Sequence, residues 1–471
     1  MVLFLSAAHS AFFSPAKYGI LPEVLEDESI SSANGVLELT TDLAILIGSI
    51  GGVYIYGIFH RDLAWAGKVF TVVACLGVIA IAFAPRAPAG NRSARFAWNV
   101  ISSFSADLAE VRRSSTMFYT IAGIAWFGFL GSFFLTIIPV FGKNELGLTE
   151  EGSGLLLALL SIGIGGGAFI AGRLSRKHVE IGLVPLGSLG ITLFALALAR
   201  SGSSPSLALL KIPADTARDL LLLGLAAGFF IIPVNALLQQ RAPAGMNGRL
   251  IAFSNVLSFT VVLVAATVPW LLTSVGLSTR RITLLVALLT LVGTVYVVRM
   301  LPDFLVRLVI WLATNTFYRI RTIGDENIPT AGALLVANHI SWVDALLIAG
   351  SMGRMVRFMM YRPYYEWPGL NWFFRLMHVI PVAANDPPDK IADSLERAHQ
   401  EIRSGHIVCI FAEGHISRTG NLLKFKRGLE RIAKHANCPI IPVYLDVSGA
   451  AFSASSVGGS SSNCQSGCSS R

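Results

Sequence analysis

Long apolar stretches occupy most of the first 300 residues of this chain, and they constrain its fold more than any other feature of the sequence. A helix needs about 20 predominantly apolar residues to cross the hydrocarbon core of a bilayer. By this measure the sequence predicts about nine spans, and therefore an α-helical polytopic membrane domain. The stretches lie near residues 2–20, 36–59, 67–84, 117–141, 154–172, 181–199, 219–238, 250–274 and 282–299.

The composition changes after about residue 300, which indicates a second module. The whole chain is 54% hydrophobic and only 14% charged, as is typical of an integral membrane protein. Residues 302–445 instead mix charged and apolar residues, as a soluble α/β domain does. We predict a membrane domain at 1–301, a linker helix at 302–321, an α/β domain at 322–447, and a Ser/Gly-rich tail at 448–471 that is disordered or a truncated end.

The predicted linker helix at 302–321 is amphipathic, with aromatic residues among its apolar positions and arginines between them. Such a helix can lie in the headgroup plane of a membrane and attach the second module to it. The alternative is an ordinary helix that packs its apolar face in a protein core.

The net charge of +9 favours lipid over nucleic acid as a partner. No run of Lys and Arg with interleaved aromatic residues is present, whereas cytoplasmic loops and anionic leaflets account for a basic excess. Basic residues in the loops at 85–116 and 173–177 predict that both face the cytoplasm, which would place residues 302–471 there as well. The opposite loops also hold basic residues, namely Lys211, Arg218, Arg280 and Arg281, and they leave the other orientation open.

Three ionisable residues in the first two apolar stretches are candidates for transport. Lys17 lies in the first stretch, and Glu38 and Asp42 lie in the second. A charged side chain at the centre of a bilayer is costly, so such residues commonly mark a substrate or ion pathway. For Lys17 and Glu38 the alternative is a position near the interface, from which a long side chain reaches water.

A weak internal repeat favours a transporter made of two related halves. Residues 11–21 and 228–238 each place a Phe-Phe pair shortly before a proline, and the two prolines, Pro15 and Pro233, lie about 220 residues apart. That is roughly the length of one six-helix half of a transporter with two parallel repeats. Three more spans would then have to precede Met1, which predicts an N-terminally shortened twelve-span protein. Chance similarity between two apolar segments is the alternative.

The five cysteines do not form a recognisable metal site or disulfide framework. None has companions at the spacing that a metal requires, so we predict no metal site. They are Cys75, Cys409, Cys438, Cys464 and Cys468.

A histidine and an aspartate follow the apolar run at 333–337. The run predicts a buried strand, so His339 would lie where the strand gives way to a turn or helix. Asp344 comes one helical turn later and could return beneath the ring. A carboxylate bonded to one ring nitrogen fixes the tautomer and leaves the other nitrogen to take a proton from a hydroxyl. The same spacing also occurs in helix-capping and surface pairs.

Further blocks follow His339 in a fixed order. AsnHisIleSerTrpValAsp at 338–344 is followed by IlePheAlaGluGlyHisIleSerArg at 410–418, PheLysArgGly at 425–428 and IleIleProVal at 440–443. In this order and at these intervals they resemble the glycerolipid acyltransferase family, which acylates 1-acylglycerol 3-phosphate or lysophospholipids. The resemblance covers about residues 320–446. It implies that the α/β domain at 322–447 is an acyltransferase that transfers an acyl group to a glycerophospholipid oxygen.

The resemblance also implies a role for individual residues. His339 would be the general base on the lysolipid hydroxyl, and Asp344 would hold its ring. The acyl donor would be acyl-CoA or acyl-carrier protein, whose thioester is already activated, so no metal and no bound cofactor is required. The implied substrate-binding residues are Asn338, Glu413, Gly414, Arg418 and Lys426, with Lys424 as an alternative source of positive charge.

The chain departs from that family at three points. AlaAlaAsn at 383–385 stands where the second block usually carries an arginine, and HisIleSer separates Glu-Gly from Arg418. From Ser448 onward, a Ser/Gly-rich composition replaces the expected further strands. These departures leave open an inactive or truncated acyltransferase domain.

The membrane half has a resemblance of its own. PheSerProAlaLysTyrGlyIleLeuProGlu at 13–23, SerAlaAsnGlyValLeuGluLeuThr at 32–40 and PheIleIleProValAsnAlaLeuLeuGln at 230–239 resemble the lysophospholipid transporter branch of the major facilitator superfamily. The resemblance covers about residues 1–300 and lacks the first three spans of that family, in agreement with the repeat.

The two resemblances lead to one functional hypothesis, with one alternative. The membrane domain would bring lysophospholipid across the bacterial inner membrane, and the cytoplasmic acyltransferase domain would reacylate it. The alternative is a transporter whose acyltransferase domain is inactive. The implied partners are lysophospholipid or acylglycerol phosphate, membrane lipids and, if it is the donor, acyl-carrier protein, but no nucleic acid.

Overall fold

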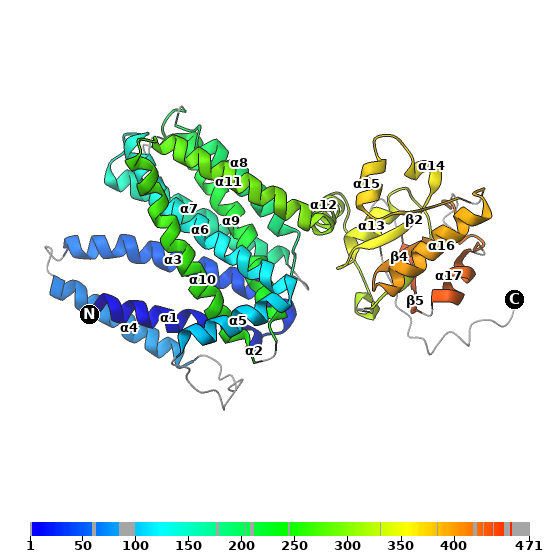
Figure 1. Ribbon diagram of the computed structural model, residues 1–471, viewed down its shortest axis with the longest axis horizontal. Coiled ribbons are helices and arrows are strands. Elements are labelled where there is room, and N and C mark those ends of the chain that lie inside the picture. Colours follow the sequence, from blue (N-terminus) through cyan, green and yellow to red (C-terminus); the bar gives the residue numbers. More distant parts are fainter. Residues whose placement is uncertain are drawn as a thin grey trace. The chain divides into compact units, whose positions relative to one another are not determined.

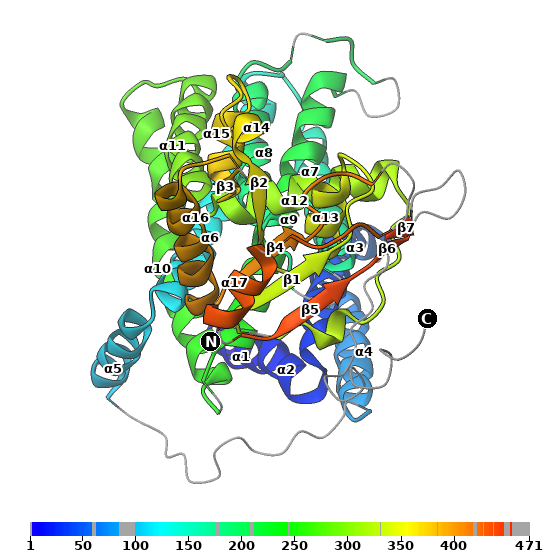
Figure 2. The same ribbon diagram turned by 90° about the vertical axis from the view of Figure 1, so that its right-hand side faces the viewer.

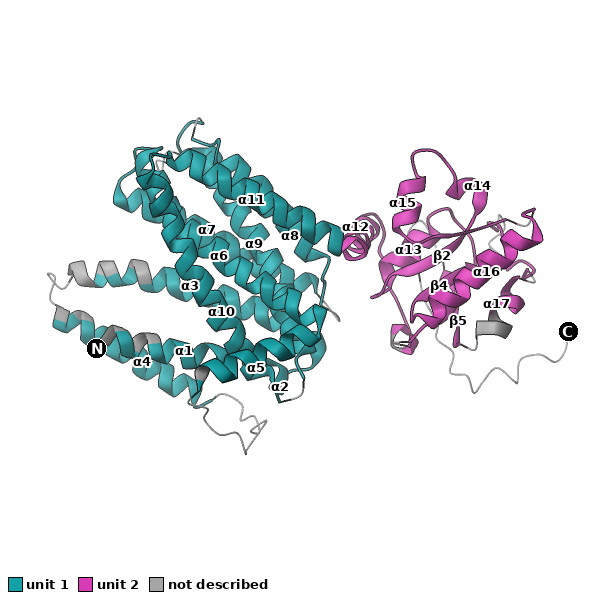
Figure 3. Cartoon of the chain, viewed as in Figure 1, with its two compact units in different colours: residues 1–300 teal, residues 301–471 magenta. Residues whose placement is uncertain are grey.

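The computed structural model of the chain divides into two compact units, residues 1–300 and residues 301–471 (Figure 3). The structure describes residues 2–58, 63–83, 99–175, 179–202, 204–207, 212–243, 245–329, 331–383, 385–417, 422–426, 428–436, 438–446 and 453–454.

The first unit is built of helices (Figure 1), and each apolar stretch predicted from the sequence lies on one of them. Six of the described helices are long and apolar enough to cross a membrane: α3, α6, α7, α9, α10 and α11. The predicted fold class is thereby confirmed for this half. The helices are α1 (Val2–Gly19), α2 (Leu21–Val24), α3 (Asp27–Ile58), α4 (Leu63–Ile81), α5 (Val100–Arg113), α6 (Ser115–Asn144), α7 (Glu150–Leu174), α8 (Leu183–Leu198), α9 (Ala214–Arg241), α10 (Asn247–Ser274) and α11 (Thr279–Met300).

Helix α5 lies within the segment that the sequence predicted as a loop at 85–116. Asn99 caps its start by accepting a hydrogen bond from the Ser102 N–H at 3.0 Å. Val111 is buried in a cluster that includes Leu250 and Phe253 of α10. A short polar helix with one apolar side is easily mistaken for a loop, because only its tertiary contacts distinguish the two.

Helices α7 and α9 approach so closely that glycine is required where they meet. A Cβ on Gly167 would stand 2.2 Å from the Leu225 carbonyl oxygen, and one on Gly228 would stand 2.3 Å from the Ala168 nitrogen. Small residues allow helix backbones to approach in a membrane, where lipid tails are as apolar as the side chains. The glycine-rich run at 162–169 is therefore a helix-packing surface.

The second unit is an α/β domain around a five-stranded parallel sheet in the order β3-β2-β4-β1-β5 (Figure 2). The predicted fold class is confirmed for this half too. The strands are β1 (Ala333–Ala337), β2 (Val356–Tyr361), β3 (Ile380–Val382), β4 (Ile407–Phe411) and β5 (Ile440–Val443), and the short β6 (Leu445–Asp446) pairs with β7 (Ser453–Ala454). The helices are α12 (Pro302–Phe317), α13 (Asp344–Ser351), α14 (Arg362–Tyr365), α15 (Asn371–Leu376), α16 (Pro388–Arg403) and α17 (Gly428–Ala436), with a 3-10 turn at Asp325–Asn327.

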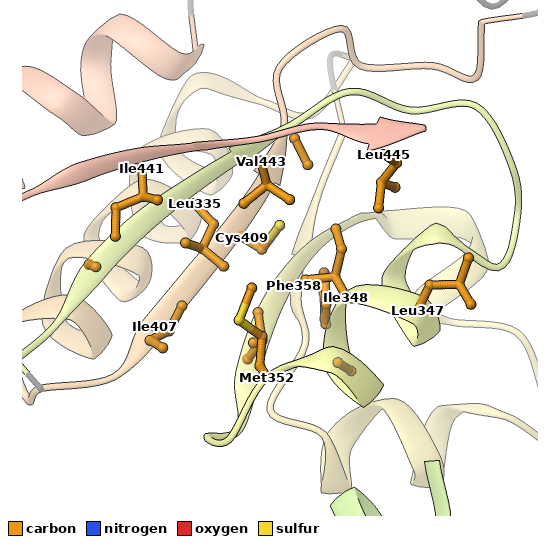
Figure 4. Packing of buried hydrophobic residues seen from close by; sticks show 14 of the residues in the cluster. Leu335, Leu347, Ile348, Met352, Phe358, Ile407, Cys409, Ile441, Val443 and Leu445 are labelled. Carbon is orange, nitrogen blue, oxygen red and sulfur yellow. The ribbon is translucent and has the colours of Figure 1, made fainter. Parts of the chain in front are cut away.

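The two faces of the sheet are covered by different helices, because alternate residues of a strand point to opposite faces. Leu335 of β1 packs in a cluster with Ile310 of α12 and Ile348 of α13 (Figure 4). Its neighbour Leu334 packs in a second cluster with Ile402 of α16. Strands buried on both faces account for the continuous apolar runs that predicted them.

The predicted linker helix at 302–321 corresponds to α12, which packs against α13 in the second unit. A Cβ on Gly350 would stand 2.2 Å from the Thr314 hydroxyl oxygen, so glycine permits this approach. Arg307 donates a hydrogen bond to the Gly353 carbonyl at 2.7 Å. The predicted tail at 448–471 lies outside the described residues except for β7.

We expect Gly167→Ala to lower the melting temperature of the detergent-solubilised chain by a few degrees, because overpacking costs about 1–3 kcal/mol. Gly166→Ala is the matched control, since no atom lies within 4 Å of a Cβ at the neighbouring position. Thermal unfolding monitored by size-exclusion chromatography measures both. Equal melting temperatures for the two variants would contradict the close approach.

Candidate functional site

His339 and Asp344 form a hydrogen-bonded pair at the carboxyl end of β1. The His339 Nδ1 and Asp344 Oδ2 atoms are 2.9 Å apart, and the Asp344 side chain is almost completely buried. The same carboxylate oxygen accepts the Ile340 N–H at 2.6 Å and the Ser341 N–H at 2.8 Å. Because Asp344 is the first residue of α13, the helix N-terminus also favours its negative charge. The Asp344 carboxylate thus bonds three consecutive residues of the loop that carries the histidine.

The His339 ring is held on its flat side by Phe411, the last residue of the neighbouring strand β4. The two ring centroids are 4.1 Å apart and the planes differ by 19°. The ring remains partly exposed, and no described residue forms a hydrogen bond with its Nε2 atom. The imidazole is therefore fixed in orientation, with one nitrogen bonded and the other accessible to a ligand.

Glu413 joins the histidine loop to the segment after β4. Its side chain is completely buried. Its Oε1 atom accepts the His339 N–H at 3.3 Å, and its Oε2 atom accepts the Leu423 N–H at 3.1 Å. The Ser417 N–H also donates to the His339 carbonyl at 2.7 Å. Buried carboxylates need such donors, so Glu413 fixes both loops relative to each other.

Gly414, the residue after Glu413, packs directly on the side chain of Lys426. Gly414 has a φ of +73°, a conformation that favours glycine. A Cβ at this position would stand 3.1 Å from Cγ and 3.3 Å from Cε of Lys426. The Lys426 N–H donates to the Ala412 carbonyl at 2.8 Å. An exposed ammonium group is consequently placed next to the Glu-Gly turn.

Asn338, predicted to bind substrate, instead has both ends of its side-chain amide engaged by Leu445. Its Nδ2 donates to the Leu445 carbonyl at 3.1 Å, and its Oδ1 accepts the Leu445 N–H at 2.7 Å. These bonds tie the end of β1 to the segment after β5. In this geometry Asn338 positions the turn, and its predicted role in substrate binding stays a prediction.

The structure brings together most of the residues predicted for the acyltransferase site. Gly414 and Lys426 are joined to the His339 loop through Glu413, and Arg418 lies outside the described residues. The sequence did not indicate roles for Phe411, which stacks on the His339 ring, or for Ser417, whose backbone N–H bonds the His339 carbonyl.

Cys409 of β4 is fully buried, and burial raises the pKa of its thiol, so it is not an activated nucleophile. No three described His, Cys, Asp or Glu residues converge as a metal site would require.

A partly buried ion pair follows β2 and β3, near the position where the family usually has an arginine. The Arg362 Nε atom lies 2.9 Å from Asp386 Oδ2 and 3.0 Å from Oδ1. Desolvation raises the pKa of Asp386, but the hydrogen bonds from Arg362 and from the Ala383 N–H outweigh it and hold that pKa below its ordinary value. Arg362 was not predicted, because it begins α14, directly after β2, and does not belong to the second block.

The three predicted transport candidates also lie together, within the first unit. Lys17 donates a hydrogen bond to the Thr41 hydroxyl and interacts electrostatically with Glu38 and Asp42. Glu38 accepts a hydrogen bond from the Tyr18 hydroxyl at 2.8 Å. The Oδ2 atom of Asp42 is buried and has no hydrogen-bond partner among the described residues. A charged cluster of α1 and α3 is therefore partly unsatisfied inside the helical unit.

An amide pair next to this cluster was missed from the sequence. Asn34 Nδ2 donates to Gln239 Oε1 at 2.7 Å, and Gln239 Nε2 donates back to Asn34 Oδ1 at 3.1 Å. Gln239 also donates to the Tyr18 carbonyl at 3.2 Å. Both side chains are buried, and the pair links α3 to α9. The sequence indicated Gln239 only as the last residue of the run at 230–239 that resembles the transporter family.

Comparison with known proteins identifies two family matches along the chain. The model described as Major Facilitator Superfamily matches residues 1–267. The model described as Acyltransferase matches residues 319–446. Both resemblances inferred from the sequence are thereby confirmed, and residues 319–446 form an acyltransferase domain.

Individual relatives match one half of the chain each. "Lysophospholipid transporter LplT" of Yersinia enterocolitica serotype O:8 is 31% identical over 252 residues, which are 52% of this chain and 58% of that protein. LplT of Yersinia pestis strain Pestoides F is 32% identical over the same shares. The chain thus spans 58% of the length of these curated relatives. The crystal structure of the 1-acyl-sn-glycerophosphate acyltransferase PlsC from Thermotoga maritima is 27% identical, covering 30% of this chain and 56% of that chain, at a TM-score of 0.24, which is too low to bear on the fold.

We expect the Arg362–Asp386 pair to make the stability of the chain depend on acid pH. The folded-state pKa of Asp386 is lowered, so the pair stabilises the fold above the unfolded-state pKa, and this contribution is lost as pH falls through the folded-state value. Melting temperatures measured from neutral pH into the acid range should therefore fall more steeply for the parent chain than for Asp386→Asn. The variant should melt lower at neutral pH. Parallel pH profiles would contradict this assignment.

Proposed function

The chain belongs to the Major Facilitator Superfamily, and we propose that it carries lysophospholipid across a membrane and reacylates it. The observation that carries the chemical half is the 2.9 Å contact between His339 and Asp344 within the acyltransferase domain. The transport half is supported by the charged cluster of α1 and α3 and by similarity to proteins named as lysophospholipid transporters. Both halves then act on the same class of molecule.

The proposed reaction is direct transfer of an acyl group to a lysolipid hydroxyl. The Nε2 atom of His339 takes the hydroxyl proton while the oxygen attacks the thioester carbonyl. When the intermediate collapses, the carbon–sulfur bond breaks and the imidazolium returns the proton to the leaving thiolate. Asp344 holds the ring through Nδ1 and stabilises its positive charge during the step. Such a mechanism uses no nucleophile from the protein.

Lys426 is the residue that we assign to the phosphate of the lysolipid. Lys426 is exposed and its stem packs on Gly414, the residue that follows Glu413 in the chain, and the Glu413 carboxylate bonds the histidine loop. An exposed ammonium near the base can attract an anionic headgroup. Glu413 itself is completely buried, so it acts by positioning both loops.

The acyl donor and the membrane orientation follow from the thioester chemistry and from the basic loops. Acyl-CoA and acyl-carrier protein both present a thioester and are both compatible with the reaction. The basic loops at 85–116 and 173–177 favour a plasma-membrane orientation with the acyltransferase domain in the cytoplasm, where such donors occur. Acylglycerol phosphate is an alternative acceptor, because it shares the hydroxyl and phosphate.

We predict that His339→Ala lowers formation of diacyl lipid by about 100-fold or more, the usual contribution of a general base. The full chain in liposomes is given labelled lysophosphatidylethanolamine and acyl-CoA or acylated carrier protein, and the lipid products are separated. His406→Ala is the matched control, since His406 precedes β4 and pairs with Glu401. Unchanged turnover in His339→Ala would refute the assigned base. Uptake by the parent chain without any acylation would favour a transporter with an inactive domain.

We predict that Asp42→Asn lowers lysophospholipid uptake into proteoliposomes by about tenfold or more, because an unsatisfied intramembrane charge is retained for function. Asp27→Asn, an exposed position at the start of the same helix, should leave uptake unchanged. The melting temperature of the detergent-solubilised variant should equal that of the parent, which shows that the helical unit is folded. Normal uptake by Asp42→Asn would exclude it from the pathway.

A further inference from the structure

The acyltransferase unit exposes a group of large apolar side chains that the reaction does not use. We call it the aromatic surface. Its three tryptophans are unusually open to solvent, with exposed fractions of 71% for Trp342, 58% for Trp367 and 66% for Trp372. The remaining members are Tyr361, Tyr364 and Leu370.

Most members of the aromatic surface belong to the connection between β2 and β3, which carries α14 and α15. Figures 1 and 2 both place these two helices side by side near β2. The ring centroids of Tyr361 and Tyr364 are 5.6 Å apart, and Trp342 meets Tyr364 edge to face at 5.2 Å. Trp342 therefore joins the β1 loop to this connection. Exposed apolar groups gathered in this way mark a surface that binds a partner or a membrane.

A short chain connection joins the unit that carries this surface to a membrane-spanning helix. Helix α11, which is apolar and long enough to cross a bilayer, ends at Met300, and α12 begins at Pro302. In the first turn of α12, Asp303 Oδ1 lies 3.5 Å from Nε2 of His378, the second residue after α15. The end of α15 is thus in contact with a residue only three positions beyond a membrane-spanning helix.

The chemistry of the surface matches the headgroup region of a bilayer. Tryptophan and tyrosine concentrate at that depth, because an apolar ring and a polar N–H or O–H are both satisfied there. Within the connection from Tyr361 to Trp372, Glu366 is the single acidic residue. The exposed Arg375 follows on α15 and can meet lipid phosphate. Helix α12 also leaves apolar side chains exposed, among them Phe317.

We propose that the aromatic surface inserts into the headgroup layer of the membrane and presents lysolipid to His339. Trp342 lies three residues after His339 in the same loop, so the surface adjoins the loop that carries the proposed base. A lysolipid could then keep its acyl chain among lipids while its glycerol hydroxyl reaches the base. Presentation of lysolipid to His339 rests on the proposed function, whereas insertion into the membrane does not. Insertion is measured without turnover, so the proposed function and the proposed insertion can each fail alone.

Fluorescence quenching of the full chain in bilayers tests the insertion. Lipids brominated near the headgroup end of the acyl chain quench tryptophans at that depth, and iodide quenches tryptophans in water. The emission lost in the double variant Trp367→Phe, Trp372→Phe reports these two residues, and phenylalanine preserves the apolar surface. Trp270→Phe is the positive control, because Trp270 is 70% exposed on the membrane-spanning helix α10.

We expect the emission of Trp367 and Trp372 to be quenched by brominated lipid and protected from iodide. Quenching by iodide without quenching by brominated lipid would overturn the proposal, since the surface would then face water. Protection from both quenchers that disappears on dilution of the protein in lipid would also overturn it, in favour of contact with a second copy.

Loss of the aromatic surface should weaken binding of a lysolipid held in a bilayer and leave the chemical step unchanged. Trp367→Asp with Trp372→Asp should raise the apparent KM for long-chain lysolipid in bilayers by about tenfold or more. Turnover of a short-chain lysolipid dissolved as monomers should equal that of the parent, which excludes unfolding. Equal KM values for the bilayer substrate, or equal losses on both substrates, would contradict a docking role.

Discussion

The candidate acyltransferase site depends on two buried carboxylates that bind one short loop. Asp344 accepts the N–H groups of Ile340 and Ser341, and Glu413 accepts that of His339, so three consecutive backbone donors are occupied. A buried carboxylate without donors costs several kcal/mol, which makes any other loop conformation unfavourable. The histidine ring is consequently fixed before a substrate arrives, and such preorganisation makes a general base effective.

The sheet topology explains how residues far apart in the sequence reach this loop. Strands β4, β1 and β5 are parallel neighbours, so their carboxyl ends lie at the same edge. His339 follows β1, Glu413 follows β4, and Leu445, which binds the Asn338 amide, follows β5. Clefts at the carboxyl ends of parallel strands are common ligand sites in α/β proteins. The order of the strands in the sheet therefore brings together residues that lie in separate blocks of the sequence.

Sequence patterns predicted the elements whose signal is local. The apolar run of β1 was sufficient, because a strand buried on both faces carries almost no polar residues. Strand β2 was missed because Arg357 interrupts its apolar run, and that arginine is buried against Glu401 of α16. The stacking of Phe411 on His339 and the pairing of Asn34 with Gln239 were missed for a different reason. Each contact joins segments whose proximity is set by the fold, and no local periodicity records it.

Under the proposed function, both units handle an amphiphile whose chain prefers lipid and whose headgroup prefers water. In the first unit, close glycine contacts between α7 and α9 build a compact scaffold around costly charges. In the second, an exposed aromatic surface includes Trp342 of the loop that carries His339, whose backbone N–H groups are bonded to buried carboxylates. A single residue separates α11 from α12, so the two units are joined by a short covalent connection. Such a tether raises the effective concentration of a released lipid at the second site, without requiring any contact between the units.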